Sequence, residues 1–222
     1  MSDLEPPLRA AIIPVTPLQQ NCTLLWCTRT RRASFVDPGG DLPRLKAAAA
    51  EAGVTIEKIL LTHGHIDHCG RAGILADELG VPIEGPSLED RFWIGRLAED
   101  GARYGIAGRP FEPKRWLLDG DEVTVGELRL KVRHCPGHTP GHVVFHHIES
   151  RLALVGDVLF KGSVGRWDFP HGDQQQLIRS ITDKLWPMGD ETAFVPGHGP
   201  MSSFGHERRT NPFVSDSALA AA

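Results

Sequence analysis

The sequence lacks the features of a membrane or nucleic-acid-binding protein. Its formal net charge is -4, so no positive field is available to attract a phosphate backbone, and we expect no nucleic-acid partner. The apolar stretch from Leu8 to Val15 is interrupted by Arg9 and Pro14, and the residues before it are acidic. Neither a secretory signal nor a membrane span is visible, and we expect a cytoplasmic protein without a membrane partner.

Cysteine is also scarce, and it carries no pairing pattern. The four cysteines, Cys22, Cys27, Cys69 and Cys135, contain no C-x-x-C pair. Cys22 and Cys27 are five positions apart on an expected strand, where successive side chains alternate between faces, so they should point to opposite sides. We therefore expect reduced, structural thiols.

Histidine, in contrast, is concentrated. The eleven histidines gather in short runs with glycine, proline and aspartate, a pattern typical of metal binding. The 222 residues, of which 41% are hydrophobic and 23% charged, suffice for one well-buried core. No repeat or linker divides the chain, so we expect a single domain over residues 1–222, with an alanine-rich tail at 215–222 that frays.

Hydrophobic patterning and turn residues predict strands and helices in both halves of the chain. Strands are expected over residues 9–15, 22–28, 33–37, 56–61, 81–84, 122–125, 127–133, 143–148, 152–155 and 192–195. Helices are expected over 42–52, 72–79, 88–99 and 174–185, the third with Phe92, Trp93 and Leu97 turned inward. This arrangement indicates an α+β fold, an αβ/βα sandwich of two mixed β-sheets flanked by helices.

The first histidine cluster follows an expected strand and reads T-H-G-H-I-D-H from Thr62 to His68. His63 and His65, two positions apart on extended backbone, project to the same side. Asp67 and His68, where a helix would begin, can turn toward a second position. Three histidines and one aspartate within six residues predict ligands for two adjacent ions.

Three further clusters also follow expected strands. In P-G-H-T-P-G-H, His138 lies in the turn and is the expected ligand, whereas His142 begins the next strand and is expected to be packed or hydrogen-bonded behind the ligands. Asp157 follows an apolar run and could bridge two cations, and His198 lies in a P-G-H-G-P turn. Strand-end loops that converge on one edge predict a single site.

The order and spacing of these four motifs resemble the metallo-β-lactamase superfamily, and within it the glyoxalase II-like (hydroxyacylglutathione hydrolase-like) enzymes, over nearly the whole chain. The run from Gly156 to Asp173 is similar to the short, single-domain YcbL-type branch. The resemblance implies a binuclear site with a first ion at His63, His65 and His138, a second at Asp67, His68 and His198, and Asp157 as the bridge.

The resemblance also implies a hydrolase. Two divalent ions can share a water whose pKa falls toward about 7, which provides a hydroxide nucleophile at neutral pH. A thiolate leaving group needs little help from an acid, so we expect hydrolysis of S-D-lactoylglutathione or a similar small thioester, with Asp67 and Asp157 as catalytic carboxylates. The ions, these aspartates and the hydroxide leave a net charge of about +1, which favours an anionic substrate.

Arg166 and Lys161 follow Asp157 closely and are the expected substrate-binding residues. Arg166 falls where the family places a basic residue for a glycyl carboxylate, but Asp168 falls where the family usually has an aromatic hydroxyl. The alternative is that Arg166 pairs with Asp168 or another acidic group and so folds the loop. Only 22 residues follow Pro200, too few for the helical extension with which hydroxyacylglutathione hydrolases contact glutathione. The sequence therefore indicates glutathione thioesters as one substrate class without fixing the substrate.

Several alternatives stay open. A persulfide dioxygenase of the same superfamily holds one iron and shares a G-R-x-D-F segment, but it would leave Asp67, His68 and His198 without a role. A lactonase or RNA-processing nuclease is less favoured, because the sole tyrosine, Tyr104, is remote from the motifs and a basic RNA-binding extension is absent. A catalytically silent metal-binding module would be expected to have lost a ligand. Mixed histidine and carboxylate ligands accept zinc, the expected metal, and also iron or manganese.

Overall fold

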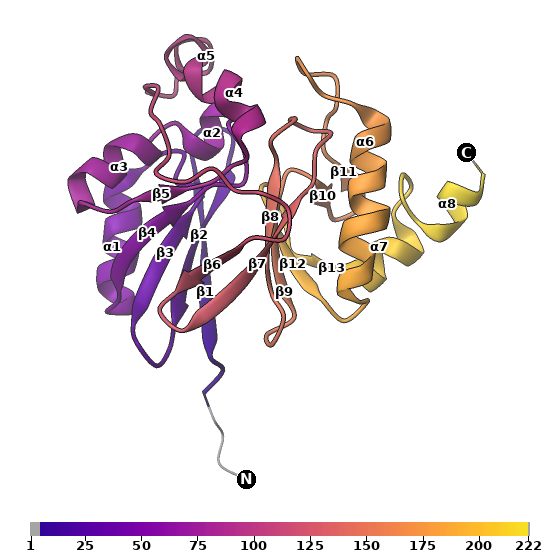
Figure 1. Cartoon of the computed structure of the whole chain (residues 1–222), viewed down its shortest axis with the longest axis horizontal. Coiled ribbons are helices and arrows are strands. Elements are labelled where there is room, and N and C mark those ends of the chain that lie inside the picture. Colours follow the sequence, from indigo (N-terminus) through magenta and orange to yellow (C-terminus); the bar gives the residue numbers. More distant parts are fainter. Residues whose placement is uncertain (1–4, 222) are drawn as a thin grey trace.

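The fold is a sandwich of four layers, in which two sheets pack face to face and helices cover both outer faces (Figure 1). The computed structural model describes residues 5–221. The N-terminal residues 1–4, on which the expectation of no secretory signal partly rested, lie outside the described part, as does the last residue of the tail. Within residues 5–221 no helix is both long and apolar enough to span a bilayer.

The first sheet is mixed, with antiparallel pairing at one edge and parallel pairing at the other. Its strands, in spatial order, are β1 (Leu8–Val15), β2 (Gln20–Cys27), β3 (Arg32–Val36), β4 (Thr55–Leu60) and β5 (Ile83–Glu84). Each of these strands was predicted from the sequence, with ends that differ by no more than two residues.

The second sheet is also mixed, because β9 and β12 pair in parallel while the other neighbours are antiparallel. Its strands, in spatial order, are β13 (Ser202–Ser203), β12 (Ala193–Pro196), β9 (Leu152–Gly156), β8 (Val143–His147), β7 (Leu128–His134) and β6 (Glu122–Val125). A small hairpin consists of β10 (Leu159–Phe160) and β11 (Ser163–Val164). The two-residue strands of the hairpin and β13 were not predicted, because alternation cannot be seen over two residues.

Helices cover the outer face of each sheet. The first sheet carries α1 (Leu42–Ala52) and α3 (Ala72–Leu79), both predicted to the residue, and the second carries α6 (Gln174–Arg179) and α7 (Phe204–Thr210) (Figure 1). The shorter helical segments are α2 (Ile66–Cys69), η1 (Leu88–Asp90), α4 (Arg91–Gly95), α5 (Leu97–Tyr104), η2 (Ser180–Leu185), η3 (Trp186–Met188) and α8 (Asp216–Ala220).

Three apolar clusters hold the layers together. The middle cluster lies between the sheets and joins Leu25 of the first to Phe145 of the second, while the outer clusters pack Phe35 and Phe194 against the helices. Each of these side chains is fully buried, which stabilises the fold by about 1.5–3 kcal/mol per side chain. Cys22 lies in an outer cluster and Cys27 in the middle one, and all four cysteines are free and buried, as predicted.

The helix predicted over 88–99 is wrong in its boundaries. The segment consists of η1, α4 and α5, because the side chain of Asp90 bonds to loops elsewhere and the chain leaves helical geometry at Arg96. Trp93 and Leu97 face inward, but Phe92 is 40% exposed, contrary to expectation. The helix continues to Tyr104.

The helical region predicted over 174–185 is present but irregular. Regular α-helix ends with α6, after which the wider π-type turns of η2 and one 3₁₀ turn, η3, carry the chain past Pro187, the expected stop. Proline is accommodated because it occupies one of the first positions of that last turn. The tail expected to fray contains the short helix α8, which Ser215 caps by accepting a hydrogen bond from Ala218 N.

Candidate metal centre

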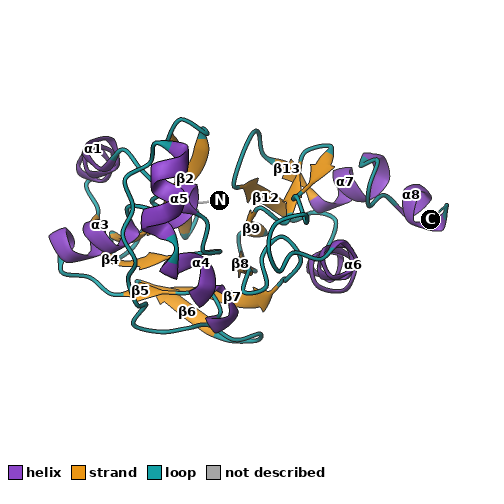
Figure 2. Cartoon of the chain, turned by 90° about the horizontal axis from the view of Figure 1, so that it is seen from above, coloured by secondary structure: helices purple, strands orange, loops and turns teal. Residues whose placement is uncertain are grey.

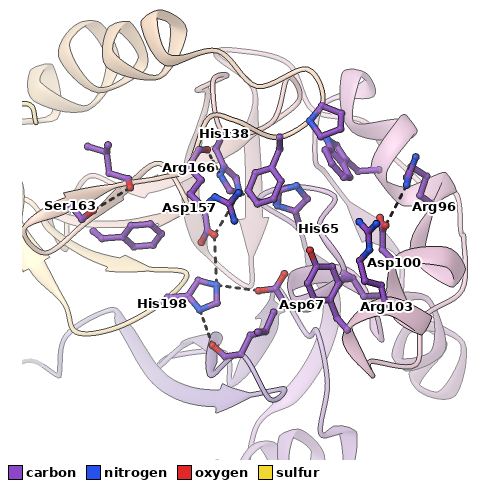
Figure 3. A pocket seen from close by; sticks show the side chains of 18 residues that line it. His65, Asp67, Arg96, Asp100, Arg103, His138, Asp157, Ser163, Arg166 and His198 are labelled. Atoms are coloured by element: carbon purple, nitrogen blue, oxygen red, sulfur yellow. Dashed lines mark hydrogen bonds and ion pairs between the residues drawn. The ribbon is translucent and has the colours of Figure 1, made fainter.

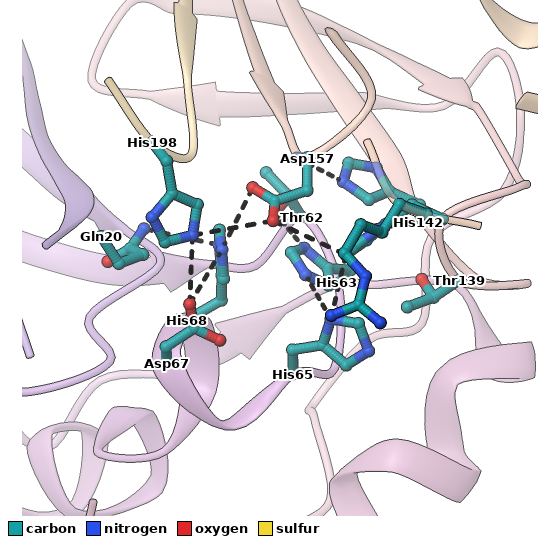
Figure 4. Close-up of polar contacts among 12 residues, drawn as sticks. Gln20, Thr62, His63, His65, Asp67, His68, Thr139, His142, Asp157 and His198 are labelled. Atoms are coloured by element: carbon teal, nitrogen blue, oxygen red, sulfur yellow. Dashed lines mark hydrogen bonds and ion pairs between the residues drawn. The ribbon is translucent and has the colours of Figure 1, made fainter. Parts of the chain in front are cut away.

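The candidate ligands lie on loops that leave the upper edge of both sheets. Seen from above, these loops meet between the two halves of the molecule (Figure 2). The first motif extends from the loop after β4 into α2. The other three motifs follow the ends of β7, β9 and β12, which run in the same direction. The structure brings all seven predicted ligands together: His63, His65, Asp67, His68, His138, Asp157 and His198 (Figure 4).

One group of three histidines forms a close triangle. Nε2 of His63 lies 3.1 Å from Nδ1 of His65, and Nε2 of His138 lies 3.0 Å from the same atom. Three nitrogens bound at about 2.0–2.1 Å to one tetrahedral ion lie about 3.4 Å apart. The triangle could therefore hold an ion after an expansion of a few tenths of an ångström.

The second group combines a carboxylate with two histidines. Oδ2 of Asp67 lies 3.1 Å from Nε2 of His198 and 3.8 Å from Nε2 of His68. The three side chains come from α2 and from the loop after β12, so this group also depends on both halves of the chain. One oxygen and two imidazole nitrogens could hold a second divalent ion.

Asp157 lies between the two groups (Figure 4). Its Oδ1 is 3.3 Å from Nε2 of His68, and its Oδ2 is 3.6 Å from Nε2 of His138 and 3.7 Å from Nε2 of His198. One carboxylate thus faces histidines of both groups. This is the position required of a bridge between two cations.

Two buried polar atoms point into this space without a hydrogen bond. Nε2 of His68 and Oδ1 of Asp157 lie 3.3 Å apart as an ion pair, but neither has a hydrogen-bond partner of suitable geometry within residues 5–221. An unsatisfied buried polar atom costs about 1–3 kcal/mol, so such atoms are rare unless they serve a ligand. Their arrangement fits metal ions, which would satisfy both.

The charge balance of the site also fits cations. Burial lowers the pKa of His63 and of His65 well below the usual range, which keeps both imidazoles neutral, as metal ligands must be. Burial opposes ionisation of Asp157, but its cationic neighbours, led by His68, outweigh burial and hold the pKa of this carboxyl well below its ordinary value. In turn, Asp157 and Asp67 outweigh burial and raise the pKa of His68. The carboxylates therefore favour a positive charge between them.

Hydrogen bonds behind the site orient the imidazole rings. Nδ1 of His68 lies 2.9 Å from Oδ2 of Asp37, a carboxylate that also accepts from the backbone N and the hydroxyl of Thr62. Nδ1 of His198 donates to the carbonyl oxygen of Leu18 at 3.1 Å. A proton held on Nδ1 leaves Nε2 free to bind an ion.

His142 is a supporting residue, as predicted. Its ring is fully buried, stacks on His63 with centroids 4.7 Å apart, and accepts a hydrogen bond from the backbone N of Asp157 at 3.1 Å. Gly156 makes this contact feasible, because its φ is +48° and an added Cβ would lie 2.6 Å from Nε2 of His142. His142 thus fixes the backbone that presents the bridging carboxylate.

Asp90 ties two histidine loops together, and the sequence analysis did not identify it. One carboxylate oxygen accepts hydrogen bonds from Gly64 N and Thr139 Oγ1, both at 2.8 Å, and the other accepts from Gly141 N at 2.6 Å. Gly64 separates His63 from His65, and Thr139 follows His138. These partners are 26, 49 and 51 positions away, so no local pattern marks Asp90.

A cavity of about 800 Å³ opens beside the ligands (Figure 3). Ligands from both groups form part of its lining, and two segments that hold no ligand build its walls. The α4–α5 wall contributes Trp93, Arg96, Asp100, Arg103 and Tyr104, and the opposite wall contributes Phe160, Ser163, Val164, Arg166, Phe169 and Pro170. Tyr104, distant from the motifs in sequence, thus lies in the cavity wall.

The two predicted substrate-binding residues differ in position. Arg166 lines the cavity, but its Nε and Nη2 pair with the two carboxylate oxygens of Asp168, each at 2.9 Å, and its guanidinium lies over the ring of Phe169 at 4.4 Å. Its carbonyl oxygen lies 2.7 Å from Nδ1 of His138, so the backbone supports a ligand. Lys161 is exposed on the turn between β10 and β11 and is not part of the cavity lining.

Comparison with known proteins identifies the class that this fold and site define. The family model of the metallo-beta-lactamase superfamily matches residues 15–198. The chain belongs to this superfamily of metallo-hydrolases, as its motifs implied, and has the corresponding α+β fold.

Three individual relatives match nearly the whole chain. The hydroxyacylglutathione hydrolase GloC of Haemophilus influenzae is 42% identical over 206 residues, which cover 92% of this chain and 97% of that protein. The BLEG-1 B3 metallo-beta-lactamase matches with a TM-score of 0.85 and 32% identity over 93% of this chain and 99% of that one. TTHA1623 in a di-iron-bound form matches with a TM-score of 0.83 and 35% identity, covering 92% and 100%. These relatives share the fold and differ in the substrates or metals that their names state.

Proposed function

We propose that this protein is a binuclear metal-dependent thioesterase that hydrolyses S-D-lactoylglutathione or a similar small anionic thioester. The observation that carries the proposal is the position of Asp157, whose carboxylate faces histidines of both ligand groups within 3.7 Å. The likeness to the hydroxyacylglutathione hydrolase GloC supports the substrate class.

The seven side chains would hold two divalent ions, with Asp67 in the second group and Asp157 shared. When bound, such ions polarise a substrate carbonyl and lower the pKa of a shared water toward about 7. Asp37, His142 and Asp90 keep the ligands in place through the hydrogen bonds described above. The donor set accepts zinc, which we propose, and also iron or manganese; TTHA1623 provides a di-iron example in a related chain.

The cavity supports a substrate of glutathione size. Its volume lies within the range of small-molecule sites, and its walls combine aromatic rings with a few charged groups. Phe160 and Phe169 would contact the apolar part of a thioester, while the ligand edge receives the reacting carbonyl. A thiolate leaving group is stable near neutral pH, so no acidic side chain is required beside it.

Assays of two enzymatic activities test the proposal. The purified protein, loaded in turn with zinc, iron or manganese, is assayed for hydrolysis of S-D-lactoylglutathione and for oxygen uptake on glutathione persulfide, with metal content measured in parallel. Thioester hydrolysis at two ions per chain is expected. Oxygen uptake at one iron per chain would instead establish a persulfide dioxygenase, and binding without either activity would establish a silent metal-binding module.

A further inference from the structure

The cavity contains three arginines, and two of them are already neutralised. Arg96 lies 2.9 Å from Glu99 and 3.6 Å from Asp100, and one edge of the Arg166 guanidinium, Nε and Nη2, is bonded to both carboxylate oxygens of Asp168. A guanidinium in such a pair has little net charge left to attract an anionic ligand, because the neighbouring carboxylate balances it. Neither residue offers the cavity a free positive charge.

Arg103 is different. It lies in the last turn of α5, its side chain is exposed, and it lines the cavity (Figure 3). Within residues 5–221 it forms no side-chain hydrogen bond and no ion pair within 4.0 Å. Figure 3 shows it on the α5 side, across from Asp157 and Arg166. Its charge would also interact with the dipole of α5, but that role affects the helix and not the substrate.

We propose that Arg103 is the residue that binds a carboxylate of the substrate, on the α5 wall of the cavity. This inference rests on the proposed thioesterase function and specifies its substrate class: a thioester whose carboxylate is several bonds from the reacting carbonyl. A guanidinium binds a carboxylate through two parallel hydrogen bonds, which gives both strength and orientation. Trp93 and Tyr104, on the same wall, would contact the part of the substrate between its carboxylate and its reacting carbonyl.

The test compares substrates with and without the remote carboxylate. S-D-lactoylglutathione and the neutral thioester S-lactoyl-N-acetylcysteamine are assayed with the wild type, Arg103→Ala, Arg103→Lys and Arg166→Ala. Arg91→Ala is the matched control, because Arg91 is an exposed arginine of the neighbouring α4 that pairs with Glu112 outside the cavity. Arg103→Ala should raise KM for S-D-lactoylglutathione about ten- to a hundred-fold with kcat nearly unchanged.

The control and the conservative variant distinguish a specific role of Arg103 from a general effect of the substitution. Arg103→Ala should leave the neutral thioester unaffected, Arg103→Lys should restore part of the loss, and Arg91→Ala should behave as the wild type. Equal losses on both substrates, no loss on either, or a larger specific loss in Arg166→Ala would overturn the assignment of Arg103 while leaving the thioesterase intact.

A binding measurement separates this inference from the proposed function. S-methylglutathione, which has the carboxylates of glutathione but no thioester, is titrated calorimetrically into the metal-loaded wild type and Arg103→Ala. Binding that weakens about ten-fold or more in the variant supports Arg103 even if no thioester is hydrolysed. Equal affinities, or no binding to the wild type, contradict the inference.

Discussion

At the scale of single residues, Asp157 has the position with the greatest chemical consequence, because its one carboxylate faces both histidine groups. We predict that Asp157→Ala abolishes turnover and weakens the binding of both ions, since it removes an anion shared by two cations. Metal content after dialysis and kcat for S-D-lactoylglutathione measure the effect. Retention of two ions and near wild-type kcat would show that Asp157 is not the bridge.

The ionisation of Asp90 makes the stability of the protein depend on pH. Burial raises the pKa of Asp90 from 3.8 to about 7, so the folded protein holds a proton that the unfolded chain releases near pH 4. The resulting stability is fully present below pH 4 and is lost as the pH rises through about 7. The free energy of unfolding of metal-free protein should therefore fall, relative to Asp90→Asn, by about 2–3 kcal/mol between about pH 5 and pH 8.

Denaturant titrations of both proteins across that range, in the presence of a chelator, test this expectation. The difference between the two curves isolates Asp90, because every other titrating group is common to both proteins. A difference that is independent of pH would mean that Asp90 is ionised throughout.

At the scale of elements, α7 supports one wall of the cavity through a buried glutamate. Glu207 is fully buried and accepts hydrogen bonds from Gly162 N at 2.8 Å, from Asn211 Nδ2 at 2.9 Å and from the hydroxyl of Ser202. Gly162 lies in the turn of the β10–β11 hairpin, which contributes Phe160 to the cavity.

Replacing this acceptor should destabilise the protein. Glu207→Ala leaves several buried donors unsatisfied, and we predict a loss of roughly 3 kcal/mol, or a decrease in Tm of about 10 °C. His206→Ala, an exposed position on the same helix, is the control and should change Tm little. Thermal melts followed by circular dichroism test this prediction. Equal melting temperatures for Glu207→Ala and the wild type would mean that the hairpin does not depend on Glu207.

The elements differ in how well the sequence predicted them. α1 and α3 were predicted to the residue, because each has a helical apolar repeat and ends at a glycine with positive φ, Gly53 or Gly80. The boundaries of the segment from η1 to α5 were not predicted correctly, because contacts with distant loops override its local preference for one continuous helix. Asp90 was not identified for the same reason, because its hydrogen-bond partners are distant in the sequence.

The grouping of the seven candidate metal ligands was predictable because each lies within a short motif at a strand end, where residue types and spacing remain visible in the sequence. The positions of the two proposed substrate-binding residues were less predictable. For Arg166 the sequence left two readings open, a substrate carboxylate or Asp168 as its partner, and the structure shows the pair with Asp168. Sequence proximity to the bridging aspartate located the cavity wall without revealing which charges on it are free.

At the scale of the whole molecule, the site joins the two halves of the sandwich. Four candidate ligands come from the first half and three from the second, so bound ions would cross-link the sheets. We predict that chelation lowers Tm by about 10 °C and that two equivalents of metal restore it, because ligand binding at 1,000 times Kd contributes about 4 kcal/mol. Differential scanning calorimetry of Asp157→Ala is the control and should show a smaller shift. No change on chelation of the wild type would contradict the cross-link.

The two cavity walls, α4–α5 and the segment from β10 to Pro170, hold none of the seven ligands. Under the proposed function, the side chains that would hold the ions and those that would contact the substrate therefore come from separate stretches of sequence. Mutational libraries restricted to α5 would then be expected to alter substrate selectivity and to leave the seven candidate ligands unchanged. This separation makes the chain a practical scaffold for directed evolution.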